Sequence, residues 1–256
     1  MIKKLLAPAV LAAVLSGCAS TSTTGQANNN DPFEGFNRSM FRFNESVDRA
    51  VLKPVAQGYV DVVPEGARSC IGNMFGNLGD VWSMMNMFLQ NRAPDGINSM
   101  FRVLFNSTLG VFGCFDLAAQ NGLPRNKADF GQTLGVWGVG SGPYLVLPLL
   151  GPSTIRDTAG LAGDFVFDPV SIGQINDHAT RYGLYGLKFT DKRAQYLGAE
   201  TFLYDVSLDP YAFTRDAYLQ RRASLIRTGR EMDDDEASLP VYEDPDDEPA
   251  PVPAAQ

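Results

Sequence analysis

The cysteine at position 18 carries the clearest chemical signal in the sequence. It follows Leu15-Ser16-Gly17, at the end of a short leader that contains Lys3, Lys4 and an apolar run too short to span a bilayer. A cysteine placed directly after small residues in such a leader is typical of a bacterial lipobox. We therefore expect cleavage before Cys18, a diacylglycerol thioether on its sulfur and an acyl chain on its new amino group. Several acyl chains anchor a protein stably where one does not, so this cysteine would hold the protein at the membrane. Residue 19 is Ala rather than Asp, which in bacterial sorting rules implies export to the outer membrane.

The other residues that could do chemistry form no recognisable catalytic or metal site. The chain has one histidine, His178, and the segment Val139-Gly140-Ser141-Gly142 lacks the first glycine of a nucleophile elbow. One histidine and scattered carboxylates provide neither an activated nucleophile with its base nor a set of metal ligands. We expect no catalytic residue, no metal and no cofactor besides the acyl chains on Cys18, and therefore a protein that is not an enzyme.

The two remaining cysteines, Cys70 and Cys114, form a possible disulfide. An exported protein enters an oxidising compartment, where cysteines pair by default. A bridge would close a loop of about 45 residues and would stabilise the fold by roughly 4 kcal/mol in the ideal case. The alternative is two buried thiols that pack as small apolar groups.

The negative charge of the chain is concentrated at its C-terminal end. The sequence has 21 basic and 29 acidic residues, and residues 231–256 hold ten of the acidic ones, no basic ones and five prolines. Once Lys3 and Lys4 leave with the leader, residues 18–230 hold 19 side chains of each sign. A neutral body has no basic face for nucleic acid, so we expect no nucleic-acid partner. The tail cannot bury a core and is expected to be disordered, either as a solvated extension or as a contact for a basic periplasmic partner.

The expected cleavage site, the polar tether and the acidic tail divide the chain into four parts. Residues 1–17 are the expected signal peptide, and residues 18–30 are a lipidated, flexible tether rich in Ser, Thr and Asn. Residues 31–230 have the length of a single domain, and residues 231–256 are the disordered acidic tail.

The pattern of the domain predicts helices. Asp31-Pro32-Phe33-Glu34 has the composition of a helix start with Asp as the N-cap. Apolar residues then recur every three to four positions from Phe36 to Val51, which predicts an amphipathic helix that ends before Pro54. Asp209-Pro210 predicts a second helix start near the other end of the domain.

Three segments of the domain, residues 81–91, 103–115 and 130–155, carry no charge. The first two are shorter than a membrane span, so they could be buried core helices or helices in the acyl region of a leaflet. The third contains six glycines and three prolines, which oppose regular helix. An irregular apolar stretch lies at membrane depth only inside protein or along a cavity. Composition leaves two interpretations open: a body half sunk in one leaflet, or a soluble core with a glycine-rich loop.

Several longer motifs follow one another along the domain. They are Asp31–Arg38 with Met40, Phe43 and Asn44; Asn73–Leu78; Arg102–Gly110; Asp129–Gly135; Gly138–Pro148; Gly151–Asp157; and Asp209–Tyr211 with Arg215, Ala217, Tyr218 and Gln220–Arg222. Together they resemble the MlaA/VacJ family of lipoproteins over residues 31–222. The tether and the acidic tail lie outside this resemblance.

The resemblance implies an all-α fold, a single ring-like domain of amphipathic helices around a central channel. It implies a place in the inner leaflet of the outer membrane, facing the periplasm and held by trimeric porins. Phospholipids that have strayed into the outer leaflet would pass through the channel to a soluble periplasmic carrier, which maintains the lipid asymmetry of the membrane. The alternative is a structural, porin-associated lipoprotein that moves no lipid, which predicts no buried polar groups along the uncharged segments.

A lipid path needs apolar wall for the acyl chains and polar groups for the head. Candidate path residues combine both features or permit close backbone approach: Phe43, Asn44, Asn106, Ser107, Gly138, Gly140 and Gly142. The alternative for each of them is core packing with local capping.

Overall fold

The computed structural model of the chain describes residues 31–167, 177–198 and 207–237. The expected signal peptide, Cys18, the tether and residues 238–256 lie outside these ranges. Helices make up most of the described chain, which confirms the all-α class. The exception is one small antiparallel hairpin of β1 (Tyr144–Leu147) and β2 (Gly151–Thr154).

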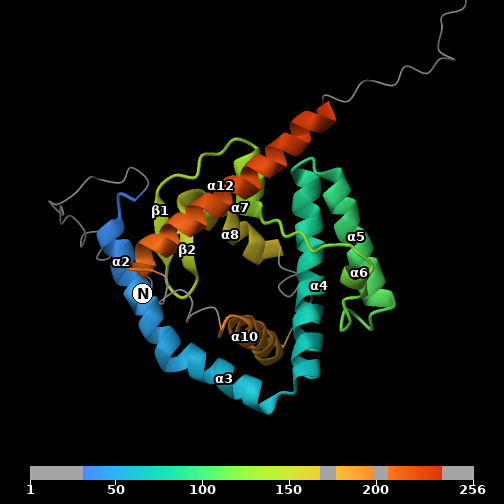
Figure 1. Ribbon diagram of the computed structural model, residues 1–256, viewed down its shortest axis with the longest axis horizontal. Helices are drawn as coiled ribbons and strands as arrows, with labels where there is room; N and C mark the ends of the chain where they lie inside the picture. The colour runs from blue at the N-terminus through green and yellow to red at the C-terminus, as the bar shows by residue number, and fades with distance from the viewer. Residues whose placement is uncertain (1–30, 168–176, 199–206, 238–256) are drawn as a thin grey trace, which may run out of the picture.

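The helices are arranged around the centre of the molecule. In chain order they are α2 (Glu34–Val47), the π-helical turn η2 (Asp48–Leu52), α3 (Lys53–Val62), α4 (Glu65–Leu89), α5 (Ala93–Thr108), α6 (Leu117–Gln120), α7 (Phe130–Val136), α8 (Ile155–Phe167), α10 (His178–Gln195) and α12 (Pro210–Ala237). Their ribbon follows a closed circuit, with α2 on the left, α3 along the bottom, α4 on the right and α12 across the upper part (Figure 1). α5 packs along the outer side of α4, and α10 lies inside the circuit (Figure 1).

The first helix does not end before Pro54, contrary to the prediction from the sequence. α2 continues through η2 into α3, and the N–H of Lys53 donates to the carbonyl of Asp48, five residues earlier. The π turn widens the helix by one residue, and Pro54 follows it in the first turn of α3, where a missing N–H is best tolerated. The wider turn therefore keeps one long helical segment along this side of the circuit.

Asp31 is not the N-cap that the sequence pattern predicted. α2 starts at Glu34, and its cap position, Phe33, makes no side-chain cap bond. The buried carboxylate of Asp31 instead accepts hydrogen bonds from the Nδ2 of Asn37 at 2.8 Å and the hydroxyl of Tyr211 at 2.5 Å. It thereby joins the beginning of α2 to α12 and closes the circuit.

α12 begins where the sequence predicted and ends later. Asp209 Oδ1 accepts from the backbone N–H of Tyr211 at 3.1 Å, and Arg38 donates to both oxygens of the same carboxylate at 3.2 and 2.7 Å. The helix continues to Ala237, so residues 231–237 are helical although the sequence analysis assigned them to the disordered tail. Growth of an existing helix adds one hydrogen bond per residue, so this acidic segment extends a helix that its own composition would not start.

The packing of α4 and α5 inverts the usual distribution of polarity. Among the described residues, seven buried side chains are hydrophobic and nineteen are polar or charged. Between the two helices, Asn77 Nδ2 donates to Ser107 Oγ at 2.9 Å, and the fully buried Arg102 pairs with Asp80 at 3.4 Å and Asp116 at 2.8 Å.

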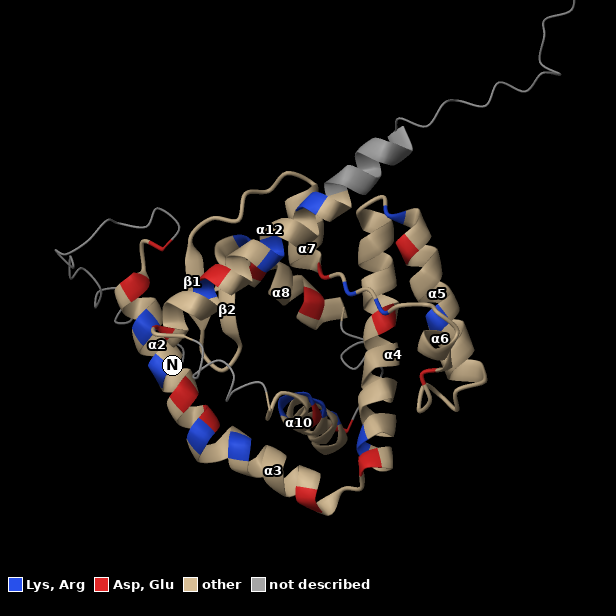
Figure 2. Cartoon of the chain, in the orientation of Figure 1, with Lys and Arg blue, Asp and Glu red and all other residues tan. Residues whose placement is uncertain are grey.

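Large apolar side chains occupy the outer faces of the same two helices. They include Met85, Phe88 and Leu89 on α4, and Phe101, Leu104 and Phe105 on α5. Figure 2 shows that α4 and α5 carry few charged residues, whereas α2 and η2 carry several. Much of the apolar surface of residues 81–91 and 103–115 is therefore not buried in a core, whereas Tyr144 and Val146 of residues 130–155 belong to the buried core cluster. In the described part of the chain, no helix combines the length and the hydropathy that crossing a bilayer requires.

A disulfide joins Cys70 on α4 to Cys114 in the loop after α5, 44 residues later. Asn73 Nδ2 donates to the carbonyl of Cys114 at 3.0 Å and attaches the same loop to α4 a second time. The loop has three successive residues with positive φ, at 51° for Val111, 56° for Phe112 and 90° for Gly113. Such a conformation is costly for a β-branched residue, so the two attachments hold the loop in a strained shape.

Candidate functional site

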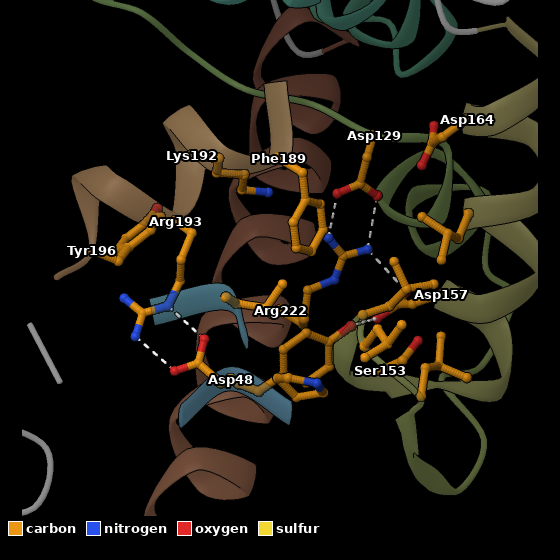
Figure 3. A pocket seen from close by; sticks show the side chains of 17 residues that line it. Asp48, Asp129, Ser153, Asp157, Asp164, Phe189, Lys192, Arg193, Tyr196 and Arg222 are labelled. Carbon is orange, nitrogen blue, oxygen red and sulfur yellow. Dashed lines mark hydrogen bonds and ion pairs between the residues drawn. The ribbon is translucent and has the colours of Figure 1, made fainter. Parts of the chain in front are cut away.

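A pocket of about 600 Å³ lies between η2, the hairpin, α8, α10 and α12, and we call it the central pocket (Figure 3). Its apolar wall is formed by Leu147, Leu149 and Leu150 of the hairpin, Leu161 of α8 and Phe189 of α10. Its charged residues are Asp48, Asp129, Asp157, Asp164, Lys192, Arg193 and Arg222. A second pocket of about 390 Å³, the side pocket, adjoins it and shares Leu52, Leu149 and Tyr196 among other residues. Together the two pockets form a continuous surface that combines apolar and charged side chains.

Two asparagines on α2 position the hairpin. Asn37 donates to the carbonyl of Tyr144 at 3.1 Å and accepts from the N–H of Val146 at 2.9 Å. Two turns later, Asn44 donates to the carbonyl of Leu147 at 2.9 Å and accepts from the N–H of Leu149 at 2.8 Å. Each side-chain amide therefore pairs with the hairpin backbone as a neighbouring strand would. The second pair also holds Leu149 at a φ of 61°, which places this half-exposed side chain at the junction of the two pockets.

An ion pair between η2 and α10 lies at the same junction. Arg193 donates its Nε and Nη2 to the two oxygens of Asp48 at 2.6 and 2.7 Å, and both residues line both pockets. α10 is attached a second time where the hydroxyl of Tyr59 donates to Asp191 at 3.0 Å. Burial and this hydrogen bond raise the pKa of Tyr59 to about 12, so the hydroxyl remains a donor at neutral pH. These contacts hold α10 against one wall of the circuit.

A network around Arg222 forms the wall of the central pocket opposite to that ion pair. Arg222 donates to both oxygens of Asp129 at 2.5 and 2.9 Å and to Asp157 at 2.9 Å. The hydroxyl of Tyr218 donates to Asp157 at 2.7 Å. Burial disfavours the ionised form of Asp157, but the hydrogen bonds from Arg222, Tyr218 and Arg156 outweigh it and hold the pKa of this carboxyl below its usual range. The network is therefore a charged but internally compensated part of the wall.

The structure brings only part of the sequence-predicted path to these pockets. Asn44 lines the side pocket, whereas Phe43 is 49% exposed and is not among the residues that line either pocket. Gly138, Gly140 and Gly142 line a separate pocket of about 460 Å³, which touches the central pocket through Arg222.

Asn106 and Ser107, which the sequence analysis named as path candidates, are not among the residues that line the central pocket or the side pocket. Asn106 Nδ2 donates to Asp116 at 2.9 Å, and its Oδ1 accepts from the N–H of Ala118 at 3.0 Å, which caps the short helix α6. Ser107 accepts from Asn77 within the interface of α4 and α5. The packing alternative applies to both residues, because their polar groups satisfy neighbouring protein groups.

The histidine that an enzyme would need lies at an exposed helix start. His178 is the first residue of α10, and its Nδ1 contacts Arg181 at 3.0 Å. The described ranges contain no group of three or more His, Cys, Asp or Glu side chains that could hold a metal ion.

Sequence reasoning missed the charged residues of the central pocket. Asp129, Asp157 and Arg222 belong to the quoted motifs, so a search of these motifs for opposite charges would have selected them. The pair of Asp48 and Arg193 is separated by 145 residues, and no local pattern indicates it.

Comparison with known proteins gives a consistent result. The model of the MlaA lipoprotein family matches residues 29–225. The intermembrane phospholipid transport system lipoprotein MlaA of Escherichia coli K12 is 38% identical over 240 residues, which cover 90% of each chain. The protein of the same name from Haemophilus influenzae is 32% identical over 245 residues, 94% of this chain and 97% of that one. A solved structure that concerns the structural basis for maintenance of bacterial outer membrane lipid asymmetry is 38% identical, with a TM-score of 0.65, and covers 77% of this chain and 98% of that one.

Proposed function

The chain belongs to the MlaA lipoprotein family, and we propose that it moves phospholipids out of the outer leaflet of the outer membrane through the central and side pockets. A soluble periplasmic carrier then receives them, so that lipid asymmetry is maintained. No covalent chemistry and no energy source are needed at this step.

The amphipathic lining of the central pocket is the observation that carries this proposal. Leu147, Leu149 and Leu150 offer a wall for acyl chains, while Lys192 on α10 offers a positive charge to a head group. Its volume of about 600 Å³ is too small for a whole phospholipid at once. The pocket would therefore hold only part of a lipid at any moment, with acyl chains against the hairpin leucines.

The inverted polarity of α4 and α5 supports a place within the inner leaflet. Leaving a large apolar side chain in water forgoes about 1.5–3 kcal/mol relative to burial, and the outer faces of these helices present many such side chains. Acyl chains cover these faces without that loss. The buried charges between the helices are paired, Arg102 with Asp80 and Asp116, as is expected of charges at membrane depth.

The proposal also includes a lipid anchor on the chain and a protein partner in the outer membrane. We propose that diacylglycerol and an N-acyl chain on Cys18 tether the body to the membrane through residues 18–30. Trimeric porins are the proposed outer-membrane partner, and phospholipid is the transported ligand.

The test measures phospholipid in the outer leaflet of intact cells with an amine reagent that does not cross the membrane. Cells that lack the protein should expose more phosphatidylethanolamine, and the wild-type chain should restore the low level. Cys18→Ala should restore it incompletely, because the body is no longer held at the membrane. An unchanged level in cells without the protein would contradict the proposal.

His178→Ala provides the control against an enzymatic function. This variant should restore asymmetry as well as the wild type, with no change in the amount of lysophospholipid.

The structural alternative is less well supported. A porin-associated lipoprotein that moves no lipid was expected to have no buried polar groups along its uncharged segments. Asn86 and Asn106 are buried in two of these segments, and charged residues line a pocket beside the third.

A further inference from the structure

Most charged side chains of the central pocket already have a partner of opposite charge. Arg193 pairs with Asp48, and Arg222 pairs with Asp129 and Asp157. These pairs largely neutralise one another, so they offer a bound ligand little net attraction. Lys192 and Asp164 are the two charges of the pocket that remain.

Lys192 projects from α10 into the pocket beside Phe189 (Figure 3). Among the described residues, its ammonium group has neither a hydrogen-bond partner nor an ion-pair partner. Lys192 is exposed, so its ammonium group is accessible to an anion that enters the pocket.

Asp164 belongs to α8 on the facing wall (Figure 3). Its Oδ1 accepts from the Nε1 of Trp82 at 2.7 Å and from the N–H of Phe130 at 2.9 Å, and both donors are neutral. No cationic side chain of the described residues forms an ion pair with this carboxylate, although the more distant charge of Arg222 favours its ionised form. Burial raises the pKa of Asp164, and the two hydrogen bonds offset only part of that effect. A cationic ligand group would therefore stabilise its ionised form.

We propose that the central pocket prefers a zwitterionic phospholipid head group, with the phosphodiester at Lys192 and the ammonium at Asp164. The inference rests on the proposed function and names the class of lipid that the pocket favours. Phosphoethanolamine carries one charge of each sign and compensates both residues. Phosphoglycerol carries the phosphodiester alone and leaves Asp164 without a counter-charge.

The experiment uses the full lipoprotein, purified in detergent and freed of bound lipid. The protein is incubated with vesicles of equimolar phosphatidylethanolamine and phosphatidylglycerol and purified again, and the retained lipids are quantified by mass spectrometry. The wild type should retain phosphatidylethanolamine in about fivefold preference, the factor that corresponds to one ion pair of about 1 kcal/mol.

Two variants separate the two charges. Asp164→Asn keeps an oxygen that accepts from Trp82 and Phe130 but removes the charge, so the retained lipids should return to the supplied ratio. Lys192→Gln should lower the retention of both lipids to a similar extent, because both contain the phosphodiester.

Matched controls change the same charges outside the pocket. Asp61→Asn and Lys127→Gln alter exposed residues and should behave like the wild type. Circular dichroism on each variant confirms that the fold is retained.

The outcomes distinguish this inference from the function on which it rests. Retention of both lipids in the supplied ratio by the wild type would overturn the head-group preference and leave lipid transport standing. Retention of neither lipid would overturn both. A wild-type preference in Asp164→Asn, or wild-type retention in Lys192→Gln, would remove that residue from the site.

Discussion

Single asparagine side chains control the position of the hairpin that separates the two pockets. Asn44 makes two hydrogen bonds to the hairpin backbone, and one of them holds Leu149 in its left-handed conformation. Asn44→Ala should therefore loosen the hairpin and lower the free energy of unfolding by about 1–2 kcal/mol. Hydrogen exchange measured by mass spectrometry should become faster over residues 144–154.

Ser46→Ala is the control for this prediction, because the Ser46 hydroxyl is exposed and donates only to the carbonyl of Arg42 in its own helix. The control should leave the hairpin protected. Equal protection in Asn44→Ala and the wild type would contradict the assigned role.

For single residues, the sequence identified polar candidates but did not predict their hydrogen-bond partners. Asn44 was predicted as a candidate residue of a lipid path, and it lines the side pocket. Asn106 has the same amide but caps α6, and Asp31 binds Tyr211 instead of capping α2. Whether an amide or a carboxylate meets backbone, a side chain or a ligand depends on contacts distant in the chain, which local spacing does not contain.

Among the elements, α7 and α8 cross at unusually close range because both have glycine at the contact. A Cβ on Gly160 would lie 2.4 Å from the backbone N of Gly131, so the helices would have to separate. Gly160→Ala should destabilise the protein by about 1–3 kcal/mol. Chemical denaturation in detergent measures the change.

Gly183→Ala on α10 is the control, and it is expected to change the stability of the protein in the opposite direction. A Cβ there meets nothing within 4 Å, so Gly183→Ala should stabilise the helix by about 0.5–1 kcal/mol. Loss of stability in both variants would show that general helix effects, and not the crossing, determine the result.

The disulfide connects α4 to the loop after α5. Replacing both Cys70 and Cys114 by Ser should lower the free energy of unfolding by up to about 4 kcal/mol, because the unfolded chain regains the freedom of a long loop. The melting temperature checks this. A reducing agent should lower the melting temperature of the wild type and leave that of the double variant unchanged; an equal response would contradict a stabilising bond.

Elements with their own start signals were predictable, and elements that depend on packing were not. The start of α12 at Asp209-Pro210 is confirmed because capping is a local interaction. The passage of the first helix across Pro54 was not foreseen, since a π turn leaves no mark in the apolar period. The hairpin within residues 130–155 was expected only as an irregular stretch, because its pairing depends on two asparagines of α2.

For the whole molecule, the outward apolar faces should bind lipid even without the acyl anchor. The Cys18→Ala chain should still associate partly with phospholipid vesicles. Adding Phe112→Asp, at a loop residue that is 79% exposed, should weaken this association at a cost of up to about 3 kcal/mol. Vesicle flotation measures the bound fraction.

Tyr182→Asp is the matched control, because Tyr182 is an aromatic residue that is 67% exposed and belongs to α10 rather than to the loop after α5. It should leave flotation unchanged. Equal flotation of the Phe112→Asp chain and its parent would contradict the placement of that loop in lipid.

The inverted polarity of α4 and α5 also constrains how the protein reaches its destination. In water, copies of the folded protein could bury these apolar outer faces only against one another. The mature fold would therefore aggregate before it reached the membrane. Delivery therefore requires either a carrier protein that covers these faces or a final packing step that takes place only at the membrane. The melting temperature then depends both on the chain and on the medium that covers its apolar faces. It should shift with the length of the detergent tail that replaces the bilayer.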